Sequence, residues 1–305
     1  MRYVGPLLFC RGWREGRLHL ACLLAIPESE QAPELSADGQ PVEAELLHHR
    51  AGYRVVRYQF TLTAGAASGY RLGDDWYPVN AEWQGDLRLA FVACNGQEHD
   101  DRNRLTDERN ALWQRLAEQH SQAPLQLLLH GGDQLYADDM LRIHPAVRAW
   151  AKHDRHYDGT AAVLPELEEM LRDYLFERYL ELYSQSPIAW PMAQVPSLAI
   201  WDDHDICDGW GSRPASQLDA PVGRLVFGVA RELYLLFQMA APTDDLPSMC
   251  PDRGKDTLSW CVRFPGLRVV VPDLRSERRP DRVIGERGWS VLRSMLATPG
   301  GRDCL

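Results

Sequence analysis

The sequence lacks any hydrophobic run that could cross a membrane. No apolar stretch in its 305 residues approaches the roughly 20 residues that a membrane-spanning helix needs. The N-terminus also lacks the charged start and the apolar core that are typical of a signal peptide. We therefore expect a cytoplasmic protein without a membrane span.

Positive charge and paired cysteines are also scarce. The formal net charge is −10 at pH 7, which argues against a broad surface for nucleic acids or anionic membranes. The seven cysteines are odd in number and show no paired spacing, so a disulfide framework is not expected. A small phosphate ester remains compatible with this charge, because bound metal ions can supply positive charge locally. Nothing in the sequence indicates an oligomeric state.

Several well-known catalytic motifs are missing. The chain has no internal repeat, and no dinucleotide-binding glycine motif, P-loop, nucleophile elbow or His-Glu-x-x-His motif stands in a fitting context. What is present is ordinary for a globular protein, with 45% hydrophobic and 25% charged residues. The length allows one large domain or two smaller ones.

The first 85 residues are rich in strand patterns and show no helical period. Strand-length segments occur at Leu18–Leu24, Val42–Leu47 and Tyr53–Phe60, with turn-forming residues between them. We predict a small N-terminal β-sandwich domain over residues 1–85. No residue in this part suggests catalytic chemistry.

From residue 87 onward, strands and helices alternate. We predict a strand at 87–93 and another at Leu125–Leu129. Between them, Thr106 caps a helix that continues to His120, so the three elements form a βαβ unit. Because such crossovers are right-handed, Cys94 and Asp133 are expected side by side at one edge of the sheet. We predict an α/β domain over residues 86–305.

The remainder of the chain continues this pattern. We predict a long helix at 165–184, a proline-punctuated loop at 187–196, a strand at 197–201, a helix at 222–241, two strands at 258–264 and 267–271, and a last helix at 286–297.

Polar side chains follow three of the predicted strands. They are Cys94 with Asn95, Asp133 with Tyr136, and the run Asp202–Asp205 that contains His204. Carboxylates can bridge two cations, whereas thiolate and phenolate favour a transition metal. Two cations about 3.5–4 Å apart can clamp a phosphoryl group and generate hydroxide from water. A histidine beside them can protonate the leaving oxygen.

Each of these features also has a simpler interpretation. An aspartate after a strand commonly caps a turn, a cysteine at a strand end is commonly buried, and Asp203 with His204 can form a surface ion pair. However, polar groups directly after a buried strand are costly unless they are solvated or paired. The three clusters together therefore favour a metal site.

The motifs resemble those of the alkaline phosphatase D (PhoD-like) family, within the metallophosphoesterase superfamily. Gly132–Asp138 and Trp201–Asp205 carry the resemblance in combination, Ala93–Asn95 is similar to the first ligand motif, and Asp273–Arg278 is similar to a later strand-end motif. The resemblance extends from about residue 87 to the end. It implies a four-layer α/β/β/α domain after a β-sandwich. It also implies a metal-dependent phosphomonoesterase or phosphodiesterase, in which metal-activated hydroxide attacks phosphorus in a small phosphate ester.

The resemblance also implies roles for individual residues. Asp133 would bridge two metals, Cys94 and Tyr136 would hold the first, Asp203 would bind the second, and His204 would assist the leaving group. Iron with calcium is implied by the family, and manganese or zinc are alternatives. Asp202 and Asp205 would support the site structurally.

One departure from the family pattern stands out. The superfamily completes its site with a later strand that carries a Gly-Asp-x-His or Gly-His-x-His motif, whereas the last histidine here is His204. Residues Arg302–Leu305 resemble the start of that strand. We therefore expect a C-terminally truncated chain with impaired activity.

Two other functions are compatible with the same residues. The first is a non-catalytic metal-binding or scaffold protein that retains the fold. The second is a hydrolase with another ester specificity.

Overall fold

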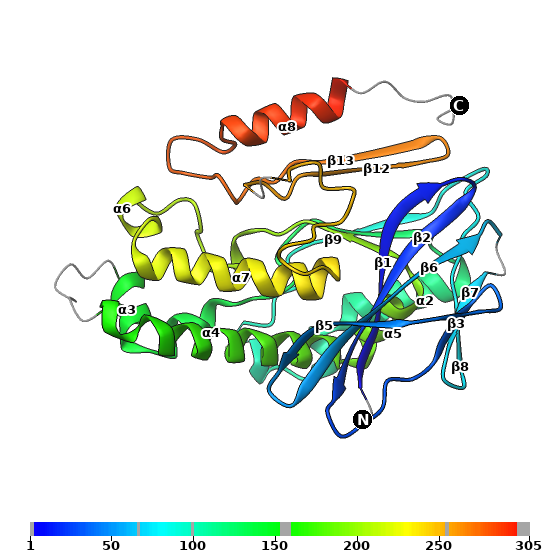
Figure 1. The fold of residues 1–305 in the computed structure, drawn as a ribbon, viewed down its shortest axis with the longest axis horizontal. Coiled ribbons are helices and arrows are strands. Elements are labelled where there is room, and N and C mark those ends of the chain that lie inside the picture. The colour runs from blue at the N-terminus through cyan, green and yellow to red at the C-terminus, as the bar shows by residue number, and fades with distance from the viewer. Residues whose placement is uncertain (1–2, 66–67, 99–100, 153–159, 254–255, 298–305) are drawn as a thin grey trace.

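A seven-stranded mixed sheet is the largest sheet of the described residues, and its first two strands, in blue, lie in the right half of Figure 1. The computed structural model describes residues 3–65, 68–98, 101–152, 160–253 and 256–297. The strand order is β5-β6-β2-β1-β11-β10-β9. Strands β1, β11, β10 and β9 run parallel to one another, and β1, β2, β6 and β5 are antiparallel neighbours. The strands are β1 (Val4–Arg14), β2 (Arg17–Pro27), β5 (Ala44–Arg50), β6 (Tyr53–Thr63), β9 (Leu89–Val92), β10 (Leu127–His130) and β11 (Ser197–Ala199).

A second sheet of four strands packs on the N-terminal part of the first. Its order is β4-β3-β7-β8, with β3 (Leu35–Ala37), β4 (Gln40–Val42), β7 (Gly69–Leu72) and β8 (Asp75–Pro78). The rings of Phe60 in β6 and Tyr70 in β7 lie 5.4 Å apart between the layers. This layering agrees with the predicted β-sandwich. The segment that we predicted as one strand at 42–47 is divided between β4 and β5, which belong to different sheets.

Strand β1 joins the N-terminal strands to the strands that carry the polar clusters. Phe9 of β1 lies opposite Ser197 of β11 in a parallel pair. The sequence pattern does not indicate β1, because residues 7–10 are continuously buried and show no alternation. Such a pattern is expected for a strand with neighbours on both sides and covered faces. The domain boundary near residue 86 stays a prediction.

Helix α2 (Ala111–Gln122) makes the predicted crossover between β9 and β10. The expected helix is broken at Asn110, which separates α1 (Thr106–Arg109) from α2. Asn110 is fully buried and bonds the side chains of Gln97 and Gln185, at 3.1 and 2.8 Å. The tertiary contacts of one amide therefore override the helical pattern.

Helices α4 (Thr160–Tyr183) and α7 (Pro221–Met239) agree with the predicted long helices and pack against each other (Figure 1). Helix α7 also contacts β11, where the hydroxyl of Tyr234 donates to the carbonyl oxygen of Ala199 at 3.0 Å. This contact fixes the helix beneath the end of the strand that precedes Asp202.

The prediction of a loop at 187–196 was wrong, because residues Ser186–Gln194 form helix α5. Pro187 stands in the first turn, where its missing N–H has no partner in the helix. Pro191 lies inside the helix and removes a backbone bond there. Extensive contacts with β1 and buried residues such as Ile188 and Met192 offset that loss.

The C-terminal part contains the predicted hairpin β12 (Trp260–Phe264) and β13 (Leu267–Val271), followed by α8 (Glu286–Ala297). The hairpin and α8 lie at the top of Figure 1. Strand β12 contacts β1, and the ring of Phe264 stacks on Trp83 at 4.0 Å. The α/β class is thereby confirmed. The expected start of a further strand at Arg302–Leu305 lies outside the described residues.

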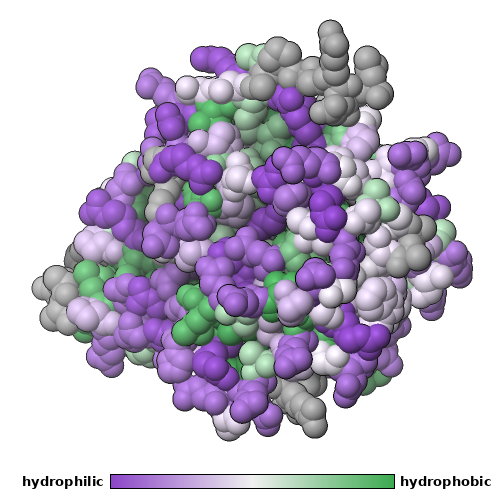
Figure 2. All heavy atoms as spheres, turned by 45° about the vertical axis from the view of Figure 1, so that its right-hand side comes forward, coloured by the Kyte–Doolittle hydropathy of each residue, from purple (hydrophilic) through white to green (hydrophobic). Residues whose placement is uncertain are grey.

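The remaining helices are short and stand between the larger elements. They are η1 (Asp101–Asn103), η2 (Asp138–Arg142), α3 (Pro145–Ala151), η3 (Asp203–Asp205) and α6 (Ala215–Leu218). On the face in Figure 2, hydrophilic residues predominate and hydrophobic residues form small patches between them. Within the described ranges, no helix is both long and apolar enough to cross a membrane. The cytoplasmic location stays a prediction.

Candidate metal centre

The ends of β9 and β10 remain paired beyond the strands. The N–H of Cys94 donates to the carbonyl of Gly132 at 3.1 Å, and the N–H of Asn95 donates to the carbonyl of Asp133 at 2.9 Å. The thiol Sγ of Cys94 lies 3.3 Å from Oδ2 of Asp133. The βαβ unit therefore places these two side chains together at the sheet edge, as the sequence predicts.

The turn after β10 depends on a glycine. Gly132 has a φ of 108°, and a Cβ atom there would lie 2.5 Å from the Cβ of Asp202. A side chain at this position would therefore push the turn away from the end of β11. The next residue, Asp133, has a φ of 55°, and Cys94 has a φ of 53°. Left-handed geometry costs a non-glycine residue about 1–2 kcal/mol, so the surrounding contacts must hold both residues in place.

Asp205 supplies much of that support. Its buried carboxylate accepts the N–H groups of Asp133, Leu135 and Asp202 at 2.7, 3.0 and 2.9 Å. The side-chain amide of Gln238 donates to it at 2.7 Å. Burial raises the pKa of Asp205 to about 6, and the hydrogen bonds from Asp202, Leu135 and Gln238 oppose the rise. Asp205 thus ties the ends of β10 and β11 together, in keeping with the supporting role that the sequence suggested.

Three carboxylates converge at this edge. Oxygens of Asp133, Asp202 and Asp203 lie within 4.8 Å of one another, and so do ligand atoms of Asp203, His204 and Asp208. Burial raises the pKa of Asp133, and the charges of Asp202 and Asp203 raise it further. A bound cation would relieve the repulsion between these negative charges. Carboxylate oxygens suit both hard cations and transition metals. The donor set therefore fits one or two metal ions.

The thiol of Cys94 lies beside this group of carboxylates, in contact with Asp133. Partial burial raises its pKa, and the hydrogen bond to Asp133 and the charge of that carboxylate add to the rise. A thiol in such acidic surroundings favours the protonated form. A bound metal ion reverses this preference, because it stabilises the thiolate.

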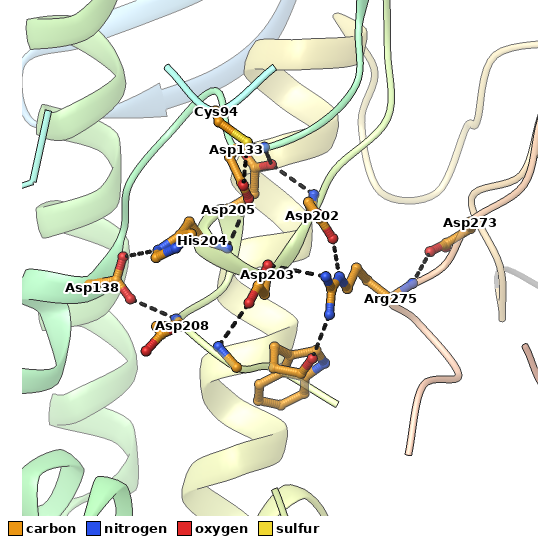
Figure 3. Close-up of polar contacts among 12 residues, drawn as sticks. Cys94, Asp133, Asp138, Asp202, Asp203, His204, Asp205, Asp208, Asp273 and Arg275 are labelled. Atoms are coloured by element: carbon orange, nitrogen blue, oxygen red, sulfur yellow. Dashed lines mark hydrogen bonds and ion pairs between the residues drawn. The ribbon is translucent and has the colours of Figure 1, made fainter. Parts of the chain in front are cut away.

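His204 contacts three other residues of the site, and Figure 3 shows two of them, Asp133 and Asp138. Its backbone N–H donates to Oδ1 of Asp133 at 3.2 Å, and Nδ1 of its ring lies 2.7 Å from Oδ2 of Asp138. Its ring stacks on Tyr136, with centroids 4.2 Å apart. The hydrogen bond to Asp138 raises the pKa of His204 to about 9, against the opposing effect of burial. The imidazole is therefore protonated near neutral pH and can donate a proton.

Arg275 enters the cluster from the segment after β13. Its Nε pairs with Oδ1 of Asp202, and its Nη2 lies 3.2 Å from Oδ1 of Asp203 (Figure 3). Oδ2 of Asp203 accepts the N–H of Gly209 at 2.9 Å. The predicted strand-end motif Asp273–Arg278 thus reaches the same edge as the other three clusters.

All five predicted site residues lie at this edge. Cys94, Asp133 and His204 are directly connected, Asp203 belongs to both acidic groups, and Tyr136 lies against His204. Burial raises the pKa of the Tyr136 hydroxyl, with the charge of Asp133 as the next contribution. Their roles as ligands and proton donor stay predictions.

Three neighbours of these residues were not assigned from the sequence. Asp138 stands in the Gly132–Asp138 motif, two residues after Tyr136, so the sequence held a signal for it. Asp208 has no such signal, and Arg275 was noted only as part of a motif. Asp202, which we interpreted as a supporting residue, is itself a member of the cluster that Asp133 and Asp203 form.

A cavity of about 420 Å³ adjoins the centre on the side of Cys94. Asn95 and Gln134 line it next to Cys94. Phe91, Leu112, Trp113 and Leu116 form apolar walls, and Arg109 and Arg115 add positive charge. This mixture can accommodate an organic group that carries a negative charge.

Comparisons with known proteins identify a related fold and a matching family. The solved structure of PhoD superposes with a TM-score of 0.59 at 16% identity, covering 97% of this chain and 60% of that one. An uncharacterized protein of Saccharomyces cerevisiae is 25% identical over 219 residues, which are 60% of this chain and 31% of the relative. This chain thus spans less than two thirds of either protein. The family model of PhoD related phosphatases matches residues 83–298. The chain therefore belongs to the family of PhoD related phosphatases.

Proposed function

We propose that this protein is a metal-dependent hydrolase of phosphoric esters, either a phosphomonoesterase or a phosphodiesterase. The observation that carries the proposal is the convergence of Asp133, Asp202 and Asp203, with oxygens within 4.8 Å of one another. Cys94 adds a soft ligand beside them, at 3.3 Å from Asp133. Membership of a phosphatase family supports the same class of reaction.

The donor set suggests how two metals would be held. Asp133 would bridge them, Cys94 and Tyr136 would hold a first, iron-like ion, and Asp203 would bind a second ion. Calcium suits the second position, and manganese or zinc are alternatives. Bound there, the metals would activate water for attack on phosphorus and neutralise charge on the phosphate oxygens.

The protein's own residues would orient the ester and move the proton. Asp138 and Tyr136 fix the imidazole of His204, which would protonate the leaving oxygen. The cavity beside Cys94 would receive the organic part of the ester. Because His204 is the one histidine that the described residues bring to the acidic groups, we expect slow turnover by this chain.

A direct test measures hydrolysis of p-nitrophenyl phosphate and bis(p-nitrophenyl) phosphate by the whole chain. The protein would be loaded in turn with iron, calcium, manganese and zinc. We expect slow, metal-dependent hydrolysis that Asp133→Asn abolishes. The control Asp219→Asn alters an exposed partner of Arg279, 2.8 Å from its Nη2, and should retain activity. Hydrolysis that survives both Asp133→Asn and chelation would refute the proposal.

The main alternative is a non-catalytic protein that binds metal or serves as a scaffold. Arg275 favours it, because the guanidinium neutralises Asp202 and Asp203 without any metal. Stoichiometric metal in a protein that hydrolyses no ester would support this alternative. Hydrolysis of carboxylic or sulfate esters, but not of phosphate esters, would instead indicate another specificity on the same site.

A further inference from the structure

The guanidinium of Arg275 uses all three nitrogens at the acidic edge (Figure 3). Nε pairs with Asp202, Nη2 lies 3.2 Å from Asp203, and Nη1 donates to the carbonyl of Trp210 at 3.1 Å. The side chain is only 13% exposed. Such a multiply bonded and shielded guanidinium is more than a surface ion pair.

The backbone around Arg275 is fixed as well. Its N–H donates to Oδ1 of Asp273 at 2.9 Å. The buried Asp273 also accepts the indole N–H of Trp201 at 3.0 Å and the N–H of Leu258 at 2.7 Å. Asp273 thereby ties the segment after β13 to the end of β11, so the guanidinium is delivered to the carboxylates by the fold.

Arg275 shares its partners with the candidate metal site. Carboxylate oxygens of Asp202 and Asp203, with one of Asp133, form the group within 4.8 Å. In Asp203, Oδ2 accepts the N–H of Gly209 at 2.9 Å and Oδ1 faces Arg275. A divalent cation on these oxygens would stand within a few ångströms of the guanidinium, and two positive charges at that separation repel each other.

We propose that Arg275 is the resident counter-cation of the second metal position. It holds Asp202 and Asp203 in place as carboxylates when no metal is bound, and a metal ion must displace it to bind there. The inference rests on the two-metal site of the proposed function. It assigns to Arg275 a positioning and competing role and makes no claim about contact with substrate.

The test is a Mn²⁺ titration of the whole chain by isothermal calorimetry, with equilibrium dialysis as a check on stoichiometry. The binding step that Asp203→Asn removes is assigned to the second position. Arg275→Gln removes the charge and keeps a hydrogen-bond donor. We expect it to tighten this step by about ten-fold, which corresponds to a change of about 1.4 kcal/mol.

Arg279→Gln is the matched control. Arg279 lies four residues further along the same segment and pairs with the exposed Asp219 rather than with the acidic edge. Its substitution should leave the Mn²⁺ affinity unchanged. An Arg275→Gln variant that binds Mn²⁺ at this position as tightly as the wild type, or more weakly, overturns the proposal.

Arg275→Lys serves if the glutamine variant does not fold. Lysine keeps the charge but lacks the planar fork that contacts two carboxylates at once. We expect this variant to bind Mn²⁺ at the second position more tightly than the wild type does, and no tightening at all would contradict the inference. Absence of Mn²⁺ binding in every variant would remove both proposals. If the Mn²⁺ affinities of the variants follow the expected order but the protein hydrolyses no phosphate ester, only the proposed function is refuted.

Discussion

The carboxylate of Asp205 accepts the backbone N–H of Asp133 at 2.7 Å. This bond links η3, which follows β11, to the turn after β10, although 72 residues separate the two in the sequence. It helps to hold Asp133 at its positive φ, in the orientation that points its side chain toward Cys94. The geometry of the centre therefore depends on a buried residue outside both acidic groups.

Replacement of Asp205 should destabilise the fold. Asp205→Ala leaves the N–H groups of Asp133, Leu135 and Asp202 without their acceptor inside the protein. We expect the free energy of unfolding in urea to fall by about 3–5 kcal/mol, because buried bonds to a charged group are lost together. Asp219→Ala removes an exposed pair and should change it by less than about 1 kcal/mol. Similar losses in the two variants would show that Asp205 does not hold the strand ends.

His204→Gln should impair hydrolysis most for esters with poor leaving groups. A proton donor matters most when the departing oxygen is strongly basic, as in phenyl phosphate. We expect kcat for phenyl phosphate to fall by about 10²-fold or more, with a smaller fall for p-nitrophenyl phosphate. Asp138→Asn removes the carboxylate that orients the imidazole. It should also lower kcat for both esters, and more for phenyl phosphate. Equal effects on both esters would argue that His204 does not protonate the leaving group.

Cys94→Ser should lower the affinity for iron more than the affinity for calcium. A thiolate is a soft ligand that favours transition metals, and a serine hydroxyl is a poor substitute. We expect iron affinity to fall by more than about ten-fold, measured as metal retained after dialysis. Cys261→Ser is a suitable control, since Cys261 lies in β12 and accepts a bond from Arg268 there. An iron content that is insensitive to Cys94→Ser would exclude this cysteine as a ligand.

Local sequence patterns were enough to predict most of the α/β part and to bring the candidate site residues to one edge of the sheet. The apolar run before Asp133 and the run before Asp202 each predicted a buried strand that ends in polar residues, and β10 and β11 confirm both. The βαβ rule then placed Cys94 beside Asp133. These inferences succeeded because each depends on neighbours in the sequence or on one short crossover.

The features that the sequence did not reveal depend on contacts between distant residues. Strand β1 stands between β2 and β11. Its residue Phe9 pairs with Ser197, which is far away in the sequence. Arg275 meets Asp202 across 73 residues of sequence. No local period encodes such contacts, and the proline-containing α5 is likewise maintained by packing against β1.

The last prediction concerns His130, which lies in β10 and is only 4% exposed. Its Nε2 lies 3.1 Å from the hydroxyl of Ser197 in the neighbouring strand. Burial lowers the pKa of His130 to about 4, compared with the usual value of 6.5. Between these two values the unfolded chain binds a proton that the folded chain excludes. The contribution of neutral His130 to the stability of the fold is therefore fully present above pH 6.5, and it is lost as the pH falls toward 4.

His130→Gln should reduce this loss, because glutamine keeps a polar group near Ser197 but does not titrate. Between pH 7 and pH 5 the wild type should lose about 2 kcal/mol more than the variant in its free energy of unfolding. Urea unfolding curves at both pH values give this difference, and other titrating groups cancel because they are common to both proteins. Equal losses in the two proteins would mean that His130 takes up its proton in the folded state as readily as in the unfolded one.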